Sequence, residues 1–122
     1  GGGETGFDAA ERLAATAAAL YEGRPIVASD AVEVSLPAIA ENGAIVPVAV
    51  RCTLPGVHRI TLLSGGNPVP IIARFELHPD VLPDVATRIK LAESGVVLVV
   101  AETADGLYGA RPEIHVVRGG CA

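Results

Sequence analysis

The chain has 122 residues, of which 50% are hydrophobic, and its formal net charge at pH 7 is -5. This length predicts a single domain over residues 1–122 that buries roughly two-thirds of the surface its unfolded chain exposes. The acidic balance argues against nucleic acid or an anionic membrane surface as a partner. The longest uncharged stretch, residues 60–73, is shorter than the roughly 20 residues of a membrane-spanning helix.

An amphipathic helix is predicted near the N-terminus, over residues 7–22. Its apolar residues recur at helical spacing, at Ala10, Leu13, Ala14, Ala17, Ala18 and Tyr21. Thr5 and Asp8 resemble a capping box at its start, and Gly23 and Pro25 supply stop signals beyond its last turn. The sequence therefore predicts one helix with well-marked ends.

About seven strands are predicted after the helix, because the pattern changes to short β-branched runs separated by turn residues. The runs are residues 31–36, 45–51, 57–63, 69–77, 84–91, 95–102 and 107–117. No helical segment separates them, and a parallel crossover needs a dozen or more residues, so the runs favour antiparallel pairing. The prediction is an all-β, immunoglobulin-like antiparallel β-sandwich over residues 31–118, with the helix before it.

Turn residues and prolines refine this prediction. The turn signals are Asn42-Gly43 and Asp105-Gly106, which are typical of hairpins with positive φ angles, and the looser sequence SGGNP at residues 64–68. The prolines within strand patterns are Pro47, Pro70 and Pro112. A proline removes one donor from the ladder of a sheet, so each of the three is expected at an edge or a bulge.

Signals for catalysis or metal binding are missing from the sequence. His58, His78 and His115 are far apart, and none has a partner at metal-ligand spacing. Glu76, His78 and Asp80 could meet at a strand end, but a solvated strand-to-turn segment is favoured there. There is no nucleophile motif around a serine, no phosphate loop and no pair of carboxylates. The sequence thus predicts a protein that is not an enzyme and has no cofactor.

The two cysteines lie in very different contexts. Cys52 ends the strand pattern IVPVAVRC, where a small half-buried apolar residue is the usual interpretation. Cys121 follows Gly119 and Gly120 and precedes only Ala122, so nothing local is expected to bury it. A structural disulfide between Cys52 and Cys121, in a β-sandwich interaction module of the periplasm, is the alternative to a functional thiol in the tail.

Several longer stretches are more specific together than any motif above. They are FDAAERLAATAAALYEG, LPAIAENGAIVPVAV, ITLLSGGNPVPIIARFEL, VATRIKLAESGVVLVVAE and the final Gly-Gly-Cys. In these stretches the chain resembles the SoxY family, the sulfur-carrier subunits of the bacterial thiosulfate-oxidising Sox system. The resemblance covers nearly the whole chain.

The resemblance implies a non-catalytic, immunoglobulin-like subunit exported to the periplasm, with its signal peptide absent from this chain, and paired with the small β-sandwich subunit SoxZ. It implies that Cys121 is the covalent attachment point for sulfur intermediates, and that Gly119 and Gly120 are the flexible part of a carrier arm at residues 119–122. The family usually ends Gly-Gly-Cys-Gly-Gly, whereas this chain ends Gly-Gly-Cys-Ala.

The resemblance also implies the partner enzymes. A c-type cytochrome, SoxAX, is expected to conjugate thiosulfate to Cys121, and a manganese hydrolase, SoxB, to release sulfate from the conjugate. A sulfane dehydrogenase, SoxCD, is expected to oxidise the remaining sulfur where it is present. The carrier would move its cargo between these enzymes as part of a docked protein.

Overall fold

This computed structural model describes residues 2–120 of the chain, with side chains from residue 8 onward. These residues contain one helix and eleven strands. The helix is α1 (Gly2–Leu20). The strands are β1 (Ile26–Ala28), β2 (Val32–Ser35), β3 (Ile39–Asn42), β4 (Val46–Cys52), β5 (Val57–Leu63), β6 (Ile71–Glu76), β7 (Asp84–Ile89), β8 (Gly95–Val96), β9 (Leu98–Thr103), β10 (Leu107–Ala110) and β11 (Glu113–Arg118). Among the described residues, no helix is long and apolar enough to cross a membrane.

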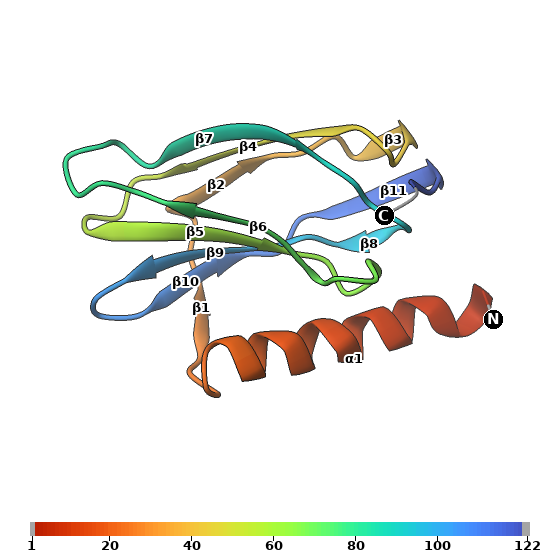
Figure 1. The fold of residues 1–122 in the computed structure, drawn as a ribbon, viewed down its shortest axis with the longest axis horizontal. Helices are drawn as coiled ribbons and strands as arrows, with labels where there is room; N and C mark the ends of the chain where they lie inside the picture. The colour runs from red at the N-terminus through yellow and green to blue at the C-terminus, as the bar shows by residue number, and fades with distance from the viewer. Residues whose placement is uncertain (1, 121–122) are drawn as a thin grey trace.

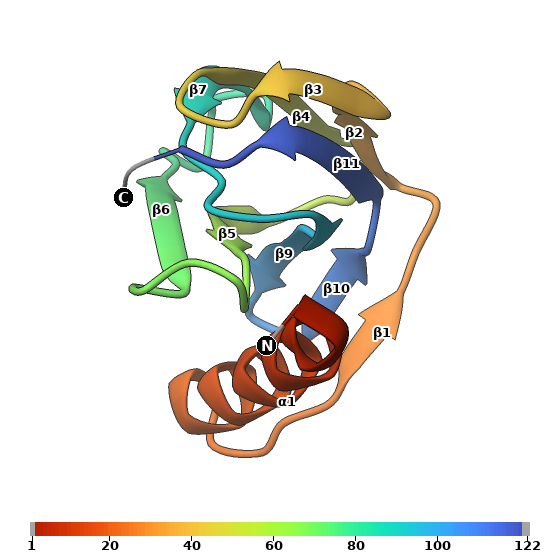
Figure 2. The same cartoon turned by 90° about the vertical axis from the view of Figure 1, so that its right-hand side faces the viewer.

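The strands form three sheets that pack as a sandwich, with the helix on the outside (Figure 1). The sheet next to α1 has the order β1-β10-β9-β5-β6, and the others have the orders β2-β4-β7 and β3-β11-β8. Figure 2 shows the helix running along one face of the five-stranded sheet while β2, β3, β4 and β7 lie beyond its other face. The predicted all-β sandwich with an N-terminal helix is confirmed.

Two strands show how the sequence pattern produces the packing. β4 alternates buried and more exposed residues, so that Val46, Val48 and Val50 enter the main core between the sheets. All six residues of β9 are buried, because the main core covers one of its faces and a second core under α1 covers the other. Leu13 and Tyr21 are the buried residues that the helix region contributes to this second core.

The helix ends close to where the sequence predicts, but it starts earlier. Glu22 and Gly23 have φ angles of 54° and 73°, and the Gly23 N–H donates to the Ala18 carbonyl at 2.8 Å, which is the usual left-handed end of a helix. At the other end α1 begins at Gly2 rather than at residue 7, so the backbone of Thr5 lies within the helix. The capping box predicted from Thr5 and Asp8 is therefore wrong.

The count of about seven strands is too low because short strands and breaks were not predicted. β1 and β3 have only three and four residues, and each forms a parallel pair, β1 with β10 and β3 with β11. The run 95–102 is divided into β8 and β9, and the run 107–117 is divided into β10 and β11 around Pro112. The two strands of each parallel pair are far apart in the sequence. The chain that connects them forms most of the rest of the sandwich.

The predicted turns are partly correct. Residues 104–106 do join β9 to β10 in an antiparallel hairpin, whereas Asn42-Gly43 joins strands of different sheets. None of these residues has a positive φ angle, so that part of the prediction is wrong.

Of the three prolines, Pro70 agrees with the prediction of an edge or a bulge, whereas Pro47 lies in a central strand and Pro112 lies between two strands. Pro47 pairs with Arg88 of β7 but lies beyond the end of β2, so its missing N–H costs no hydrogen bond on that side. Pro70 precedes the edge strand β6, beside a register shift at Leu62 and Leu63. Pro112 lies in the break between β10 and β11.

Candidate functional site

The tail of the chain leaves the sandwich at the end of β11, directly beside β3. Its first two residues, Gly119 and Gly120, belong to the described part of the structure, whereas Cys121 and Ala122 lie outside it. Figure 1 shows the end of β11 at the same end of the sandwich as β3 and β8. The described part of the site therefore consists of the residues that hold the base of the tail.

Three backbone hydrogen bonds hold this base. The Gly43 N–H donates to the Arg118 carbonyl at 2.8 Å, and the Leu91 N–H donates to the Gly43 carbonyl at 2.8 Å. The Gly120 N–H donates to the Leu91 carbonyl at 2.9 Å. We call this set of contacts among Gly43, Leu91, Arg118 and Gly120 the tail clasp.

Glycine is required in the tail clasp by space. A Cβ atom on Gly119 would lie 2.0 Å from the Ala92 carbonyl oxygen, and one on Gly120 would lie 2.7 Å from the Ala44 nitrogen. A Cβ on Gly43 would lie 2.2 Å from the Leu91 carbonyl oxygen. Backbone therefore packs closely against one side of both Gly119 and Gly120. Their role as a flexible arm stays a prediction.

Asn67 supports the tail clasp from the other side of Leu91. Its side-chain Nδ2 donates to the Lys90 carbonyl at 2.7 Å, and its Oδ1 accepts from the Ala92 N–H at 2.9 Å. Asn67 is only 5% exposed. Sequence analysis missed this residue because SGGNP has the composition of a loose turn, and the one available signal was an asparagine between glycines and a proline.

Cys52 lies in the main core at the end of β4, where it is 4% exposed. This position agrees with the prediction that Cys52 is a packing residue. Burial raises the pKa of the Cys52 thiol. The tail clasp lies beside Ala44 at the opposite end of β4, and the six steps from Val46 to Cys52 span roughly 20 Å. A disulfide needs Cα atoms within about 7 Å of each other. Gly120, the last described residue of the tail, lies near the end of β4 opposite to Cys52, and a bridge to Cys121 concerns a residue outside the described part of the chain.

Comparison with known families identifies what kind of chain this is. Residues 17–121 match the family described as sulfur oxidation protein SoxY, so the match covers most of the chain and extends to Cys121. The chain belongs to the SoxY family.

The solved structure of a SoxY protein agrees with this assignment. The sulfur carrier protein SoxY from Chlorobium limicola f thiosulfatophilum is 34% identical, with a TM-score of 0.82, over 93% of this chain and 98% of that one. A superoxide reductase, the neelaredoxin from Ignicoccus hospitalis, is 22% identical, with a TM-score of 0.65, over 75% of this chain and 94% of that one. The second likeness shows the fold alone. Comparison with curated proteins finds no match.

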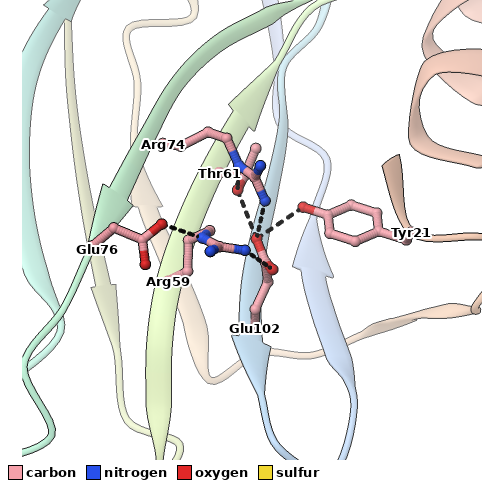
Figure 3. Close-up of polar contacts among 6 residues, drawn as sticks. All are labelled: Tyr21, Arg59, Thr61, Arg74, Glu76 and Glu102. Atoms are coloured by element: carbon pink, nitrogen blue, oxygen red, sulfur yellow. Dashed lines mark hydrogen bonds and ion pairs between the residues drawn. The ribbon is translucent and has the colours of Figure 1, made fainter. Parts of the chain in front are cut away.

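A second polar cluster of this SoxY-family chain is built around a buried carboxylate (Figure 3). Glu102 of β9 accepts hydrogen bonds from Thr61 Oγ1 at 2.7 Å, Arg59 Nη1 at 3.1 Å and Tyr21 Oη at 3.2 Å. Arg74 Nη2 lies 3.4 Å from the same carboxylate. The charge of this buried group is thus fully compensated, and the cluster joins the end of the helix to the five-stranded sheet.

The same cluster sets the acid–base properties of its tyrosine. Burial, together with the nearby negative charge of Glu102, raises the pKa of Tyr21 to about 12. Arg59 also pairs with the exposed Glu76, which holds the pKa of that carboxyl below its usual range. Both arginines are thus engaged by carboxylates, so the cluster is a structural connection and is separate from the tail clasp.

The histidines of this SoxY-family chain make none of the hydrogen bonds of the tail clasp. His78 lies 3.8 Å from Asp80 in an exposed loop, while Glu76 is paired with Arg59 instead. The His115 ring lies 3.4 Å from Ser94 Oγ on the surface. Among the residues whose side chains are described, no group of three histidine, cysteine, aspartate or glutamate side chains could hold a metal ion.

Proposed function

We propose that this chain is a covalent carrier of sulfur intermediates in thiosulfate oxidation, with the substrate attached to the thiol of Cys121. The observation that carries the proposal is the family match, which covers residues 17–121 and so extends to this cysteine. The relative from Chlorobium limicola f thiosulfatophilum is itself described as a sulfur carrier protein. The tail clasp adds a physical argument, because its hydrogen bonds hold the start of the tail at one end of the sandwich.

The loading step oxidises the thiol and thiosulfate together. The Cys121 sulfur forms a bond to the sulfane sulfur of thiosulfate, which gives a cysteine S-thiosulfonate and releases one proton and two electrons. A c-type cytochrome of the SoxAX kind accepts the electrons. An exposed thiol of ordinary pKa is only a few per cent thiolate near neutral pH, so the cytochrome is where activation would occur.

The unloading step is a hydrolysis. Water attacks the terminal sulfonate sulfur, the sulfur–sulfur bond to it breaks, and sulfate, two protons and a cysteine persulfide anion are produced. A manganese hydrolase of the SoxB kind would catalyse this step, and SoxCD would oxidise the persulfide sulfur where it is present. The chain itself provides no catalytic group. It keeps a small anion from diffusing away and presents it to each enzyme.

Burial argues against Cys52 as the attachment site. Cys52 is 4% exposed, and burial raises the pKa of its thiol, which disfavours the reactive thiolate. Cys121 directly follows Gly120, which lies at the end of the sandwich and is only half-buried. The burial of Cys52 supports its role as a packing residue, and it leaves Cys121 as the candidate attachment site.

Two further parts of the proposal concern the cellular setting. The chain would form a heterodimer with SoxZ, and it would work in the periplasm after export. The proposal includes neither nucleic acid nor a membrane among the partners, consistent with the net charge of -5.

Tetrathionate provides a direct chemical test. A thiolate attacks a sulfane sulfur of tetrathionate, thiosulfate leaves, and the cysteine keeps the same S-thiosulfonate that the loading step would produce. Intact-mass measurement should find one adduct on the wild-type chain and on Cys52→Ser, and none on Cys121→Ser. The same order is expected for thiosulfate-dependent reduction of the cytochrome. An adduct that persists in Cys121→Ser and is lost in Cys52→Ser would overturn the site assignment.

A further inference from the structure

The backbone around Leu91 is held on both of its edges. In an extended chain the N–H and C=O of one residue point to one side, and the flanking C=O and N–H point to the other. Leu91 uses its own groups to bond Gly43 and Gly120, while the flanking groups of Lys90 and Ala92 bond the side chain of Asn67. The carboxamide of Asn67 thus replaces a neighbouring strand, and Leu91 itself is fully buried.

Asn67 is in turn fixed by the helix. Arg12 Nη2 of α1 donates to the backbone carbonyl of Asn67 at 2.6 Å, and the Asn67 N–H donates to the Ser64 carbonyl at 3.3 Å. The same loop is pressed against the helix at Gly65, where a Cβ would lie 1.8 Å from the Ala9 carbonyl oxygen. A continuous set of contacts therefore connects α1, the loop at residues 64–68, the Leu91 segment and the base of the tail.

We propose that Asn67 is a positioning residue for the carrier tail, which holds Leu91 where it can anchor Gly120 and so fixes the point from which Cys121 is presented. The inference rests on the proposed function. With the tail clasp closed, a single residue step of about 3.3 to 3.6 Å separates the anchored Gly120 from Cys121. With the tail clasp open, the free segment starts at Arg118, so the thiol of Cys121 can occupy a larger volume. A short, oriented segment loses less freedom when the thiol enters a partner's active site.

The main test variant is Asn67→Ala, which removes both side-chain bonds to the Leu91 segment. Amide hydrogen exchange at Gly120 should become about tenfold faster or more, since two hydrogen bonds that support the anchor are lost. In thiosulfate-dependent cytochrome reduction, the kcat for the carrier should fall several-fold while KM stays unchanged, because the docking surface is intact.

Two further variants make the result specific. Thr103→Ala is a matched control, because the Thr103 hydroxyl also bonds backbone groups, those of Asp105 and Gly106, in the hairpin at the far end of the sandwich (Figure 1). It should change neither Gly120 exchange nor kcat. Arg12→Ala leaves the carboxamide in place and loosens only its support, so it should act in the same direction as Asn67→Ala but less strongly.

Cys52 reports whether a variant has merely lost its fold. It is buried in the main core, so a general opening would make it reactive towards an alkylating reagent, whereas a loosened tail would not. If Asn67→Ala exposes Cys52, the inference is tested on Arg12→Ala instead. Gly120 exchange and kcat are then measured for that variant. Unchanged Gly120 exchange, or faster exchange with an unchanged or higher kcat, would overturn the inference while leaving the proposed function in place. A wild-type chain that supports no cytochrome reduction would overturn the proposed function, and the inference with it.

Discussion

Single residues at the base of the tail are constrained by space as well as by the conformational freedom that their type indicates. Two consecutive glycines before a terminal cysteine predict a slender, mobile segment, because glycine has the widest conformational range. In the folded chain, their lack of a side chain also lets Gly119 and Gly120 pack against the backbone of Ala92 and Ala44. Small size is what the described part of the site requires of them.

The first prediction concerns Gly119. Gly119→Ala places a methyl group 2.0 Å from the Ala92 carbonyl oxygen, so the tail clasp must shift. We expect the free energy of unfolding to fall by about 1–3 kcal/mol, as for other overpacked sites, in urea denaturation followed by circular dichroism. Gly106→Ala is the control, because its new methyl group would meet nothing closer than Tyr108 at 3.6 Å. Equal stability of the two variants would show that the clasp yields without cost.

The second prediction concerns the buried thiol. Burial raises the pKa of Cys52, so in the folded chain the thiolate is rarer at any pH than in the unfolded chain. At pH 8, iodoacetamide should modify Cys121 and spare Cys52 until urea is added, as peptide mass analysis would show. Because the folded state keeps this proton more tightly, the stabilising contribution is complete below the ordinary thiol pKa and is lost as the pH rises beyond it. Rapid modification of Cys52 in the native protein would contradict the packing role.

At the level of elements, the periodicity of the sequence identified the helix and the longer strands and missed the short strands. Helical spacing between Leu13 and Tyr21 and alternation in β4 are strong signals, since each places one face in a core. β1 and β3 have too few residues to show a period, and their parallel partners are far away in the sequence. The role of Asn67 was hidden for the same reason, because its partners at residues 90 and 92 come from another part of the chain.

The third prediction concerns the connection between helix and sheet. The Tyr21 hydroxyl donates to buried Glu102 at 3.2 Å, and the pKa of Tyr21 is raised to about 12. A raised folded-state pKa means that stability is complete below the ordinary value of 10.0 and is lost as the pH rises towards 12. Tyr21→Phe should lower stability at pH 7 by about 1–3 kcal/mol, because a buried acceptor loses one donor. The variant should also show a smaller loss of stability between pH 9 and 11 in thermal unfolding. An alkaline profile identical to that of the wild type would contradict this role of Tyr21.

At the scale of the whole molecule, the described surface carries exposed apolar side chains of the kind that a partner protein covers. Large apolar side chains are exposed on neighbouring strands, at Ile39 of β3 (62%) and Val117 of β11 (58%). Sequence composition alone could predict an excess of apolar residues, but only the folded chain shows which of them stay outside. This surface is one that a partner such as SoxZ could cover.

The fourth prediction is that the chain alone self-associates and that SoxZ prevents this. Static light scattering should show a mass above that of the monomer, and Ile39→Lys should reduce it. Leu82→Lys is the matched control, because Leu82 is even more exposed (79%) but lies outside the strands, between β6 and β7. A clean monomer at high concentration, with no binding to co-expressed SoxZ, would contradict the expectation.

The central claim is that sulfur intermediates reside on Cys121, and the most direct measurement is the intact mass of the chain isolated without reductant from cells that oxidise thiosulfate. Fragmentation of the same ions then assigns any adduct to a residue. We predict that part of the population carries sulfane or thiosulfonate sulfur on the C-terminal fragment that contains Cys121, and that the fragment containing Cys52 is unmodified. A mass two hydrogens below that of the free chain, with Cys52 and Cys121 joined in one fragment, would contradict the account and favour a structural disulfide.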